Sequence, residues 1–205
     1  AGCGYYMKRI AVLVSGGGTN LQALIDAEKN GILKSGKIVT VVSNKPDVYA
    51  LERAKNSQIP TKVITKKEFD GDSDAFNRAL LTYLDGQKID LVILAGFLAI
   101  LSPELTKRYE NRIINVHPSL IPSFCGDGFY GLRVHQAALD YGVKVTGATV
   151  HFVNEITDGG KIILQKAVEI LPDDTAESLQ KRVMEEAEWQ LLPQAAELFC
   201  SGKLN

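Results

Sequence analysis

Apolar and polar positions alternate in two rhythms over the first half of the chain. Amphipathic stretches, with apolar residues three and four positions apart as in helices, separate short runs that are apolar at most positions. Such runs are typical of strands buried on both faces of a sheet, and they cover residues 10–14, 38–42, 61–65, 91–95 and 113–116. The alternation predicts an α/β fold in which a mostly parallel, twisted sheet carries helices on both faces.

The pattern changes in the second half of the chain. The elements predicted there are a loop rich in Pro and Gly at 118–131, a helix at 134–141, strands at 143–152 and 161–170, and a helical pattern at 175–199. We expect this last helix to break near Pro193. Nothing between these segments resembles a linker, so residues 7–205 are expected to form a single domain. Residues 1–6, which precede Met7, are expected to be a foreign extension.

Composition excludes several classes of protein. Hydrophobic residues make up 45% of the 205 positions, which is enough to bury a core, and the net charge is -1, which argues against a nucleic-acid-binding surface. The longest apolar run, residues 91–101, is shorter than the ~20 residues of a membrane helix. The three cysteines are far apart in the sequence, which argues against a disulfide framework or a zinc site and favours a reducing, cytoplasmic compartment.

A glycine-rich segment, residues 15–20, follows the first predicted strand and opens the first predicted helix. Backbone amides at such a position can bind a phosphate, and Thr19 and Asn20 can add side-chain hydrogen bonds. The segment differs from a dinucleotide fingerprint because Leu21 stands where the last glycine would be, and it lacks the lysine of a Walker loop. We favour phosphate binding, and a tight turn without a ligand is the alternative.

A second set of glycines matches the dinucleotide spacing literally. Gly126, Gly128 and Gly131 have this spacing, but Pro118 and Pro122 separate them from the preceding strand. We interpret this segment as a flexible loop and as a candidate cover over the site.

Candidate catalytic residues occur at the end of the fifth predicted strand. Alternate residues of a strand face the same side, so Asn115 and His117 point in the same direction. An amide can hydrogen-bond a developing oxyanion, and an imidazole can donate or shuttle a proton near neutral pH. A satisfied polar pair at a strand end explains the same residues equally well.

The turn formed by Asp158, Gly159 and Gly160 supplies a carboxylate between two predicted strands. Its carboxylate could pair with a histidine, orient the ring and favour its charged form. An acidic turn without a catalytic role fits the same sequence. Of the two remaining histidines, we expect His135 to be solvated or to cap a helix, and His151 to be a hydrogen-bonded structural residue in a strand.

Four segments together resemble the phosphoribosylglycinamide formyltransferase family, the folate-dependent enzymes of purine synthesis. They are residues 15–24, residues 94–102, residues 115–122, and residues 149–153 with the turn at 158–160. The resemblance runs in order from about Arg9 to the C-terminus. It implies a formyltransferase fold with a Rossmann-like, phosphate-binding N-terminal half and a C-terminal half that binds folate and performs catalysis.

The resemblance also implies the reaction. The formyl group of 10-formyltetrahydrofolate, the co-substrate, would pass to the amine of glycinamide ribonucleotide and give N-formylglycinamide ribonucleotide. No metal, nucleic acid or membrane would take part, and the chain would act as a monomer or a homodimer. Related formyltransferases that modify methionyl-tRNA or amino sugars, and a formate-releasing hydrolase, are the alternatives within this chemistry. A nucleotide-sensing module and a dinucleotide oxidoreductase are the alternatives outside it.

Residue roles follow from the same resemblance. The catalytic residues would be Asn115, His117 and Asp158, and the ribonucleotide would be bound by Gly18, Thr19, Asn20 and Glu188. The folate would be bound, largely through backbone groups, by Leu98, Ala99, Ile100, Leu101, Asn115, Asn154, Glu155, Ile156, Thr157 and Asp158. The chain departs from the family pattern at Ala99, where Arg is common. The last helix is one residue longer before its proline, which makes Glu185 and Glu186 alternatives to Glu188.

Overall fold

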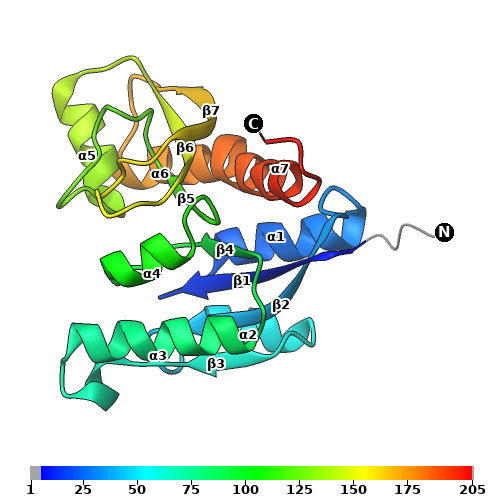
Figure 1. The fold of residues 1–205 in the computed structure, drawn as a ribbon. Coiled ribbons are helices and arrows are strands. Elements are labelled where there is room, and N and C mark those ends of the chain that lie inside the picture. The colour runs from blue at the N-terminus through cyan, green and yellow to red at the C-terminus, as the bar shows by residue number, and fades with distance from the viewer. Residues whose placement is uncertain (1–5, 205) are drawn as a thin grey trace.

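The computed structural model describes residues 6–204 and contains one seven-stranded sheet with the order β3-β2-β1-β4-β5-β6-β7 (Figure 1). The strands are β1 (Lys8–Val14), β2 (Gly36–Ser43), β3 (Thr61–Val63), β4 (Leu91–Leu94), β5 (Ile113–His117), β6 (Val145–Phe152) and β7 (Ile162–Glu169). β1 to β5 are parallel, whereas β6 pairs antiparallel with both β5 and β7. The predicted mostly parallel sheet is confirmed, and the expected foreign extension lies, except for Tyr6, outside the described residues.

The helices alternate with the strands as the hydrophobic spacing predicts. They are α1 (Thr19–Asn30), α2 (Tyr49–Asn56), the 3-10 helix η1 (Lys66–Phe69), α3 (Ser73–Gly86), α4 (Pro103–Arg108), α5 (Leu132–Tyr141), α6 (Ala176–Val183), the π-helix η2 (Met184–Glu188) and α7 (Trp189–Cys200). Ser102 caps α4 by accepting a hydrogen bond from the Leu105 amide, with Pro103 in the first turn. Among residues 6–204, none of the helices combines the length and hydrophobicity that crossing a bilayer requires.

Successive residues of β1 face opposite sides of the sheet. Ile10, Val12 and Val14 belong to a buried cluster that includes residues of α1 and α7, whereas Ala11 and Leu13 belong to a second cluster with residues of α3 and α4. All five side chains are fully buried. Helices therefore cover both faces of the sheet, as the fully apolar run predicts.

The strand order reverses beside β1, because β2 lies on one side of it and β4 on the other. Connections that leave the carboxyl ends of these strands diverge, and in open α/β sheets this point is where ligands bind. The glycine-rich loop follows β1 at this point, and the segment after β4 lies beside it. A ligand site is therefore expected at the carboxyl ends of β1, β4 and β5.

The expected break near Pro193 is wrong. The helix remains continuous there, and its irregularity lies earlier, at the π-helix Met184–Glu188. The Trp189 amide donates back to the Met184 carbonyl, five residues earlier, so this turn is wider than an α-helical turn. The wider turn accommodates one additional residue between α6 and α7 without ending the helix, and Pro193 lies inside α7.

Candidate active site

The glycine-rich loop is held in place by its backbone conformation and by its packing on α2. Gly18 has φ 78°, in the left-handed region, and a Cβ there would lie 2.7 Å from the Ala50 Cβ. Gly16 accepts a hydrogen bond from the Ala50 amide at 3.1 Å. A Cβ on Gly16 or Gly17 would meet nothing within 4 Å. Gly18 therefore anchors the loop, and the two preceding glycines leave space for a ligand to approach the backbone.

Ser15 links this loop to the segments that follow β2 and β4. Its hydroxyl donates to the Asn44 Oδ1 at 2.6 Å and accepts a hydrogen bond from the Leu98 amide at 2.9 Å. Ser15 is almost completely buried. The two predicted binding segments, residues 15–20 and 98–101, are consequently joined by one side chain that the motif contains but to which sequence reasoning assigned no role.

Among the three glutamates considered from the sequence, Glu188 is the one that faces the loop. Glu185 and Glu186 are exposed, whereas Glu188 is 5% exposed and its Oε1 accepts a hydrogen bond from the Asn20 Nδ2 at 3.2 Å. Burial raises the pKa of Glu188 to about 7, and the bond from Asn20 acts in the opposite direction. The π-turn directly before α7 contains Glu188 itself.

Two polar atoms of this pair have no hydrogen-bond partner within residues 6–204. The Asn20 Oδ1 and the Glu188 Oε2 are buried without a hydrogen bond in the structure. Buried polar atoms are normally satisfied, and a polar ligand is one way to satisfy them. With a pKa close to neutral, the Glu188 carboxyl can donate or accept such a bond. The pair therefore suits hydroxyl groups of a bound molecule.

Antiparallel pairing of β5 and β6 places His151 directly opposite Asn115. The Asn115 Nδ2 lies 3.2 Å from the His151 Nε2, and the His151 Nδ1 lies 2.8 Å from the Phe152 carbonyl oxygen. A carbonyl accepts only, so Nδ1 carries the proton of the neutral ring and Nε2 accepts from the Asn115 amide. Burial lowers the pKa of His151 and favours this neutral form, although the Phe152 bond and Asp158 act in the opposite direction.

His117 is held between a loop carbonyl and a carboxylate. Its Nε2 donates to the Phe124 carbonyl oxygen at 2.8 Å, and its Nδ1 lies 3.7 Å from the Asp158 Oδ2. The Asp158 Oδ2 also accepts a hydrogen bond from the Gly126 amide at 2.9 Å, and the Asp158 Oδ1 lies 3.7 Å from the His151 Nε2. The side chains of His117 and Asp158 are only 5% and 9% exposed, so this contact is shielded from water.

The structure thus brings together the three residues proposed as catalytic. Asn115, His117 and Asp158 form one cluster at the carboxyl end of β5, with the Asp158–His117 contact at 3.7 Å, beyond a hydrogen bond but within ion-pair distance. The cluster also contains His151. Sequence reasoning correctly expected His151 to be a hydrogen-bonded strand residue, but it assigned no functional role to this side chain. The missing signal is the β5–β6 register, which depends on the pairing of distant strands.

The expectation for His135 is wrong. His135 lies in α5 but is 1% exposed, and neither ring nitrogen has a hydrogen-bond partner among the described residues. Burial lowers its pKa to about 4, and the nearby His117 acts in the same direction. The reason is the helix face: Val134, His135 and Ala138 all point inward. Its polar neighbours in the sequence suggested exposure, but tertiary packing covers the ring.

The segments expected to bind folate present apolar side chains. Leu98, Ile100 and Ile156 are 59%, 83% and 62% exposed, whereas Leu101 belongs to the buried core. Among residues 6–204, His, Cys, Asp and Glu form no group of three that could bind a metal ion.

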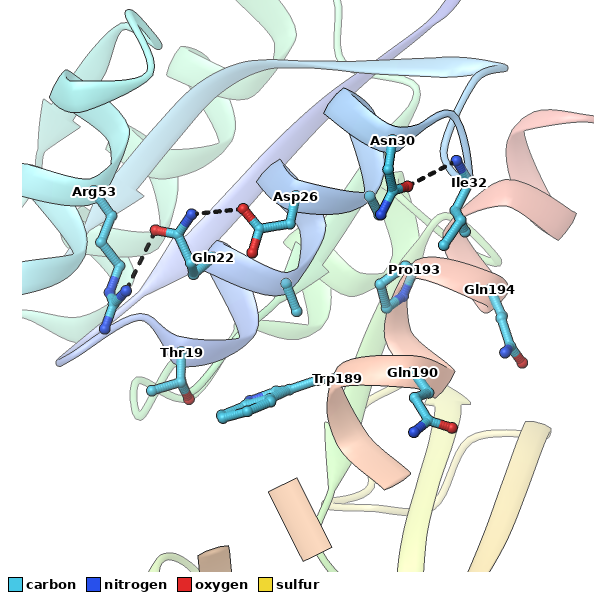
Figure 2. A pocket seen from close by; sticks show the side chains of 12 residues that line it. Thr19, Gln22, Asp26, Asn30, Ile32, Arg53, Trp189, Gln190, Pro193 and Gln194 are labelled. Carbon is cyan, nitrogen blue, oxygen red and sulfur yellow. Dashed lines mark hydrogen bonds between the residues drawn. The ribbon is translucent and has the colours of Figure 1, made fainter. Parts of the chain in front are cut away.

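A cavity of about 390 Å³ lies between α1 and α7, next to the glycine-rich loop (Figure 2). On the α7 side, Trp189 and Pro193 contribute apolar surface beside two glutamines, and near the loop Gln22, Thr19 and Arg53 contribute polar groups. The Trp189 Nε1 is buried, and no hydrogen-bond partner for it lies within the part of the chain that the structure describes. The cavity begins at the N-terminus of α1, where the loop ends.

Comparisons with known proteins identify the family. The family model described as formyl transferase matches residues 8–196. A phosphoribosylglycinamide formyltransferase from Haemophilus influenzae is 44% identical over 97% of this chain and 90% of its own length. A trifunctional purine biosynthetic protein from Gallus gallus is 45% identical over 96% of this chain, which spans 19% of that protein.

Solved structures support the same relationship. The glycinamide ribonucleotide transformylase 1 from Symbiobacterium toebii superposes with a TM-score of 0.91 at 40% identity, covering 98% of this chain and 91% of that chain. A phosphoribosylglycinamide formyltransferase from Brucella melitensis superposes with a TM-score of 0.86 at 40% identity, covering 98% and 99%. The chain therefore belongs to the formyl transferase family and, within it, to the phosphoribosylglycinamide formyltransferases.

Proposed function

We propose that the chain transfers the formyl group of 10-formyltetrahydrofolate to the amine of glycinamide ribonucleotide, giving N-formylglycinamide ribonucleotide in purine biosynthesis. The supporting observation is the cluster at the end of β5. There the Asp158 carboxylate lies 3.7 Å from the His117 imidazole, and the Asn115 amide is linked to the same carboxylate through His151. Such a cluster combines an oxyanion donor, a proton carrier and a charge that stabilises the carrier. We place the reaction in the cytoplasm, in line with the free thiols of Cys125 and Cys200.

The ribonucleotide binds at the glycine-rich loop in this proposal. The amides at the start of α1, together with Gly18, Thr19 and Asn20, bind its phosphate, since the positive end of the helix dipole favours an anion. Glu188 binds ribose hydroxyls through Oε2, which has no hydrogen-bond partner among the described residues. This arrangement directs the amine of the substrate toward the end of β5.

The folate donor binds between the segment after β4 and the loop before β7. Its flat ring system suits the apolar rim formed by Leu98, Ile100 and Ile156, which are all more than half exposed. Ala99, Leu101, Asn154, Glu155 and Thr157 complete the proposed set, mainly through their backbone groups. Asn154 stabilises its loop by accepting the Ile156 amide at 2.9 Å.

The reaction begins when the neutral amine of the ribonucleotide attacks the formyl carbon. Asn115 and protonated His117 donate hydrogen bonds to the oxygen as it gains negative charge. The new carbon–nitrogen bond forms, the bond from the carbon to the folate nitrogen breaks, and the amine proton passes to that nitrogen through His117 or water. A neutral amine is already nucleophilic, so this scheme requires no metal ion.

His117 must exchange a hydrogen bond for this scheme to operate. Its Nε2 donates to the Phe124 carbonyl, so the reacting oxygen has to replace that carbonyl as the acceptor. Asp158 faces the other ring nitrogen and holds the imidazole in place during the exchange. The Asn115 amide needs no such rearrangement, because its bond to His151 leaves a second N–H available.

The variants Asn115→Ala and His117→Ala test the proposal. Each should lower kcat by about 10²–10³, the usual cost of removing one oxyanion donor. Formyl transfer is followed with and without glycinamide ribonucleotide, which separates transfer from hydrolysis of the folate. Near-normal turnover in either variant would refute the assignment, and formate release without ribonucleotide would indicate a hydrolase instead.

A further inference from the structure

One cation lies directly on the glycine-rich loop. Arg53 comes from α2, and its Nε donates to the Gly17 carbonyl oxygen at 2.7 Å. Its Cδ would lie 3.3 Å from a Cβ built on Gly18, so the aliphatic part of the side chain follows the loop backbone. Neither Thr19 nor Asn20 carries a charge, although a phosphate monoester carries close to two negative charges near neutral pH. Arg53 is therefore placed to supply the charge that the loop itself lacks.

The charge of Arg53 is not neutralised within the part of the chain that the structure describes. None of the ion pairs among residues 6–204 involves Arg53, and the adjacent Glu52 pairs with Lys55 instead. The guanidinium lies 4.7 Å from the Tyr49 ring centroid and makes one long bond, 3.3 Å, to the Gln22 Oε1. Stacking holds the group in position while leaving N–H donors available.

The surroundings of Arg53 form the polar end of the cavity between α1 and α7. Figure 2 shows Arg53 and Trp189 extending toward Thr19 from two different helices. Arg53 is the sole cation among the residues that line this cavity, all of which belong to the described 6–204. Trp189 also lines the cavity, and its buried Nε1 has no hydrogen-bond partner among residues 6–204. Residues of α1, α2 and α7 thus line the cavity together at the end next to the loop.

We propose that Arg53 binds the phosphate of the ribonucleotide substrate and makes the enzyme specific for the phosphorylated form. This inference rests on the proposed function, and it adds a residue to the loop that binds the phosphate. The planar guanidinium can direct two N–H groups at phosphate oxygens while its Nε keeps the bond to Gly17. Arg53 takes no part in the chemical step, so its loss should affect substrate binding and leave kcat nearly unchanged.

The kinetic test compares a phosphorylated with an unphosphorylated substrate. Arg53→Gln should raise the KM for glycinamide ribonucleotide about 10- to 100-fold, as expected for the loss of a charge-assisted contact. The same variant should leave kcat/KM for glycinamide riboside, which lacks the phosphate, within about twofold of the unsubstituted enzyme. Arg53→Lys keeps the charge without the planar group, so its KM for glycinamide ribonucleotide should lie between those of Arg53→Gln and the unsubstituted enzyme. Lys55→Gln, an exposed cation on the same helix, is the matched control and should change neither value.

A binding measurement decides the point independently of activity. Trp189 is the single tryptophan of the chain and lines the cavity, so its fluorescence reports titrations with ribose 5-phosphate and with ribose. Arg53→Gln should weaken binding of ribose 5-phosphate about tenfold or more and leave binding of ribose unchanged.

Two results would overturn the inference. If Arg53→Gln weakens the phosphorylated and the unphosphorylated compound of each pair equally, Arg53 only supports the loop through Gly17. If KM and binding of the phosphorylated compounds are unchanged in this variant, Arg53 binds no phosphate. Failure of the proposed function appears differently, as absence of formyl transfer by the unsubstituted enzyme. In that case the ribose 5-phosphate titration still decides the role of Arg53, and thermal unfolding confirms that each variant is folded.

Discussion

The two ends of the site are built in different ways. The glycine-rich loop is fixed by backbone: Gly18 is in the left-handed region, and the loop hydrogen-bonds to the start of α2. The cluster at the end of β5 is fixed by side chains. His151 of β6 hydrogen-bonds to Asn115, and Asp158 of the loop after β6 faces His117 and His151. The difference teaches that the first region should be sensitive to backbone strain and the second to the loss of single polar groups.

Among the variants that test this comparison, removal of the Asp158 carboxylate should have the largest effect. Asp158→Asn takes away the charge that faces the Nδ1 of His117 and should lower kcat about 10²-fold with little change in the midpoint of thermal unfolding. Asp127→Asn is the matched control, because Asp127 is an exposed acid of the neighbouring loop. Steady-state kinetics on both variants measure the effect, and full activity of Asp158→Asn would remove the contrast between the two regions.

The glycine loop should respond to a single methyl group. Gly18→Ala combines a left-handed backbone with a contact of 2.7 Å to the Ala50 Cβ, so unfolding should require about 2 kcal/mol less free energy. Gly17→Ala, at a position with open space, is the control and should leave stability nearly unchanged. Urea denaturation measures both variants. Equal stabilities would contradict a loop anchored at Gly18.

Loss of the imidazole opposite Asn115 should have a smaller effect on turnover. His151→Leu removes the acceptor that orients the Asn115 amide and should lower kcat about tenfold with little change in KM. His151→Gln retains an acceptor oxygen and should recover part of the activity. His135→Leu, which replaces another buried histidine without a bond to Asn115, is the control. Comparable losses in His151→Leu and His135→Leu would show that burial, and not positioning, is responsible.

The smallest expected effect is on how the free energy of unfolding depends on pH. Burial lowers the pKa of His135 from 6.5 to about 4. Between these two pH values the imidazole is protonated in the unfolded chain and neutral in the folded protein. Its contribution to stability is therefore complete above about pH 6.5 and is lost progressively as the pH falls toward about 4. Between about pH 7.5 and about pH 5.5 the loss should be about 1 kcal/mol.

This effect is measured by urea denaturation of the protein and of His135→Leu at both pH values. The variant should lose less stability than the unsubstituted protein over this range, because it lacks the titrating group. The difference between the two proteins isolates His135 from other groups that titrate in the same range. Parallel stability curves would contradict a buried, neutral His135.

Much of the fold could be predicted from local patterns. The fully apolar run at β1 correctly predicted a strand buried on both faces, and Ser102 with Pro103 correctly predicted the start of α4. Helix irregularity could not be predicted in the same way. Pro193 suggested a break because proline lacks a backbone N–H, yet α7 continues through it. The irregularity is the π-helical turn before Trp189, which accommodates the one additional residue of this helix.

Sequence alone determined the order of strands and helices, the glycine-rich loop after β1 and the pairing of Asn115 with His117 on one side of a strand. These depend on spacing between near neighbours, which the chain carries in its own order. Tertiary structure decided that His151 lies opposite Asn115, that Asp158 faces both imidazoles, and that Glu188 turns inward. Strand register and helix rotation depend on packing between segments far apart in the chain, and no local pattern records them.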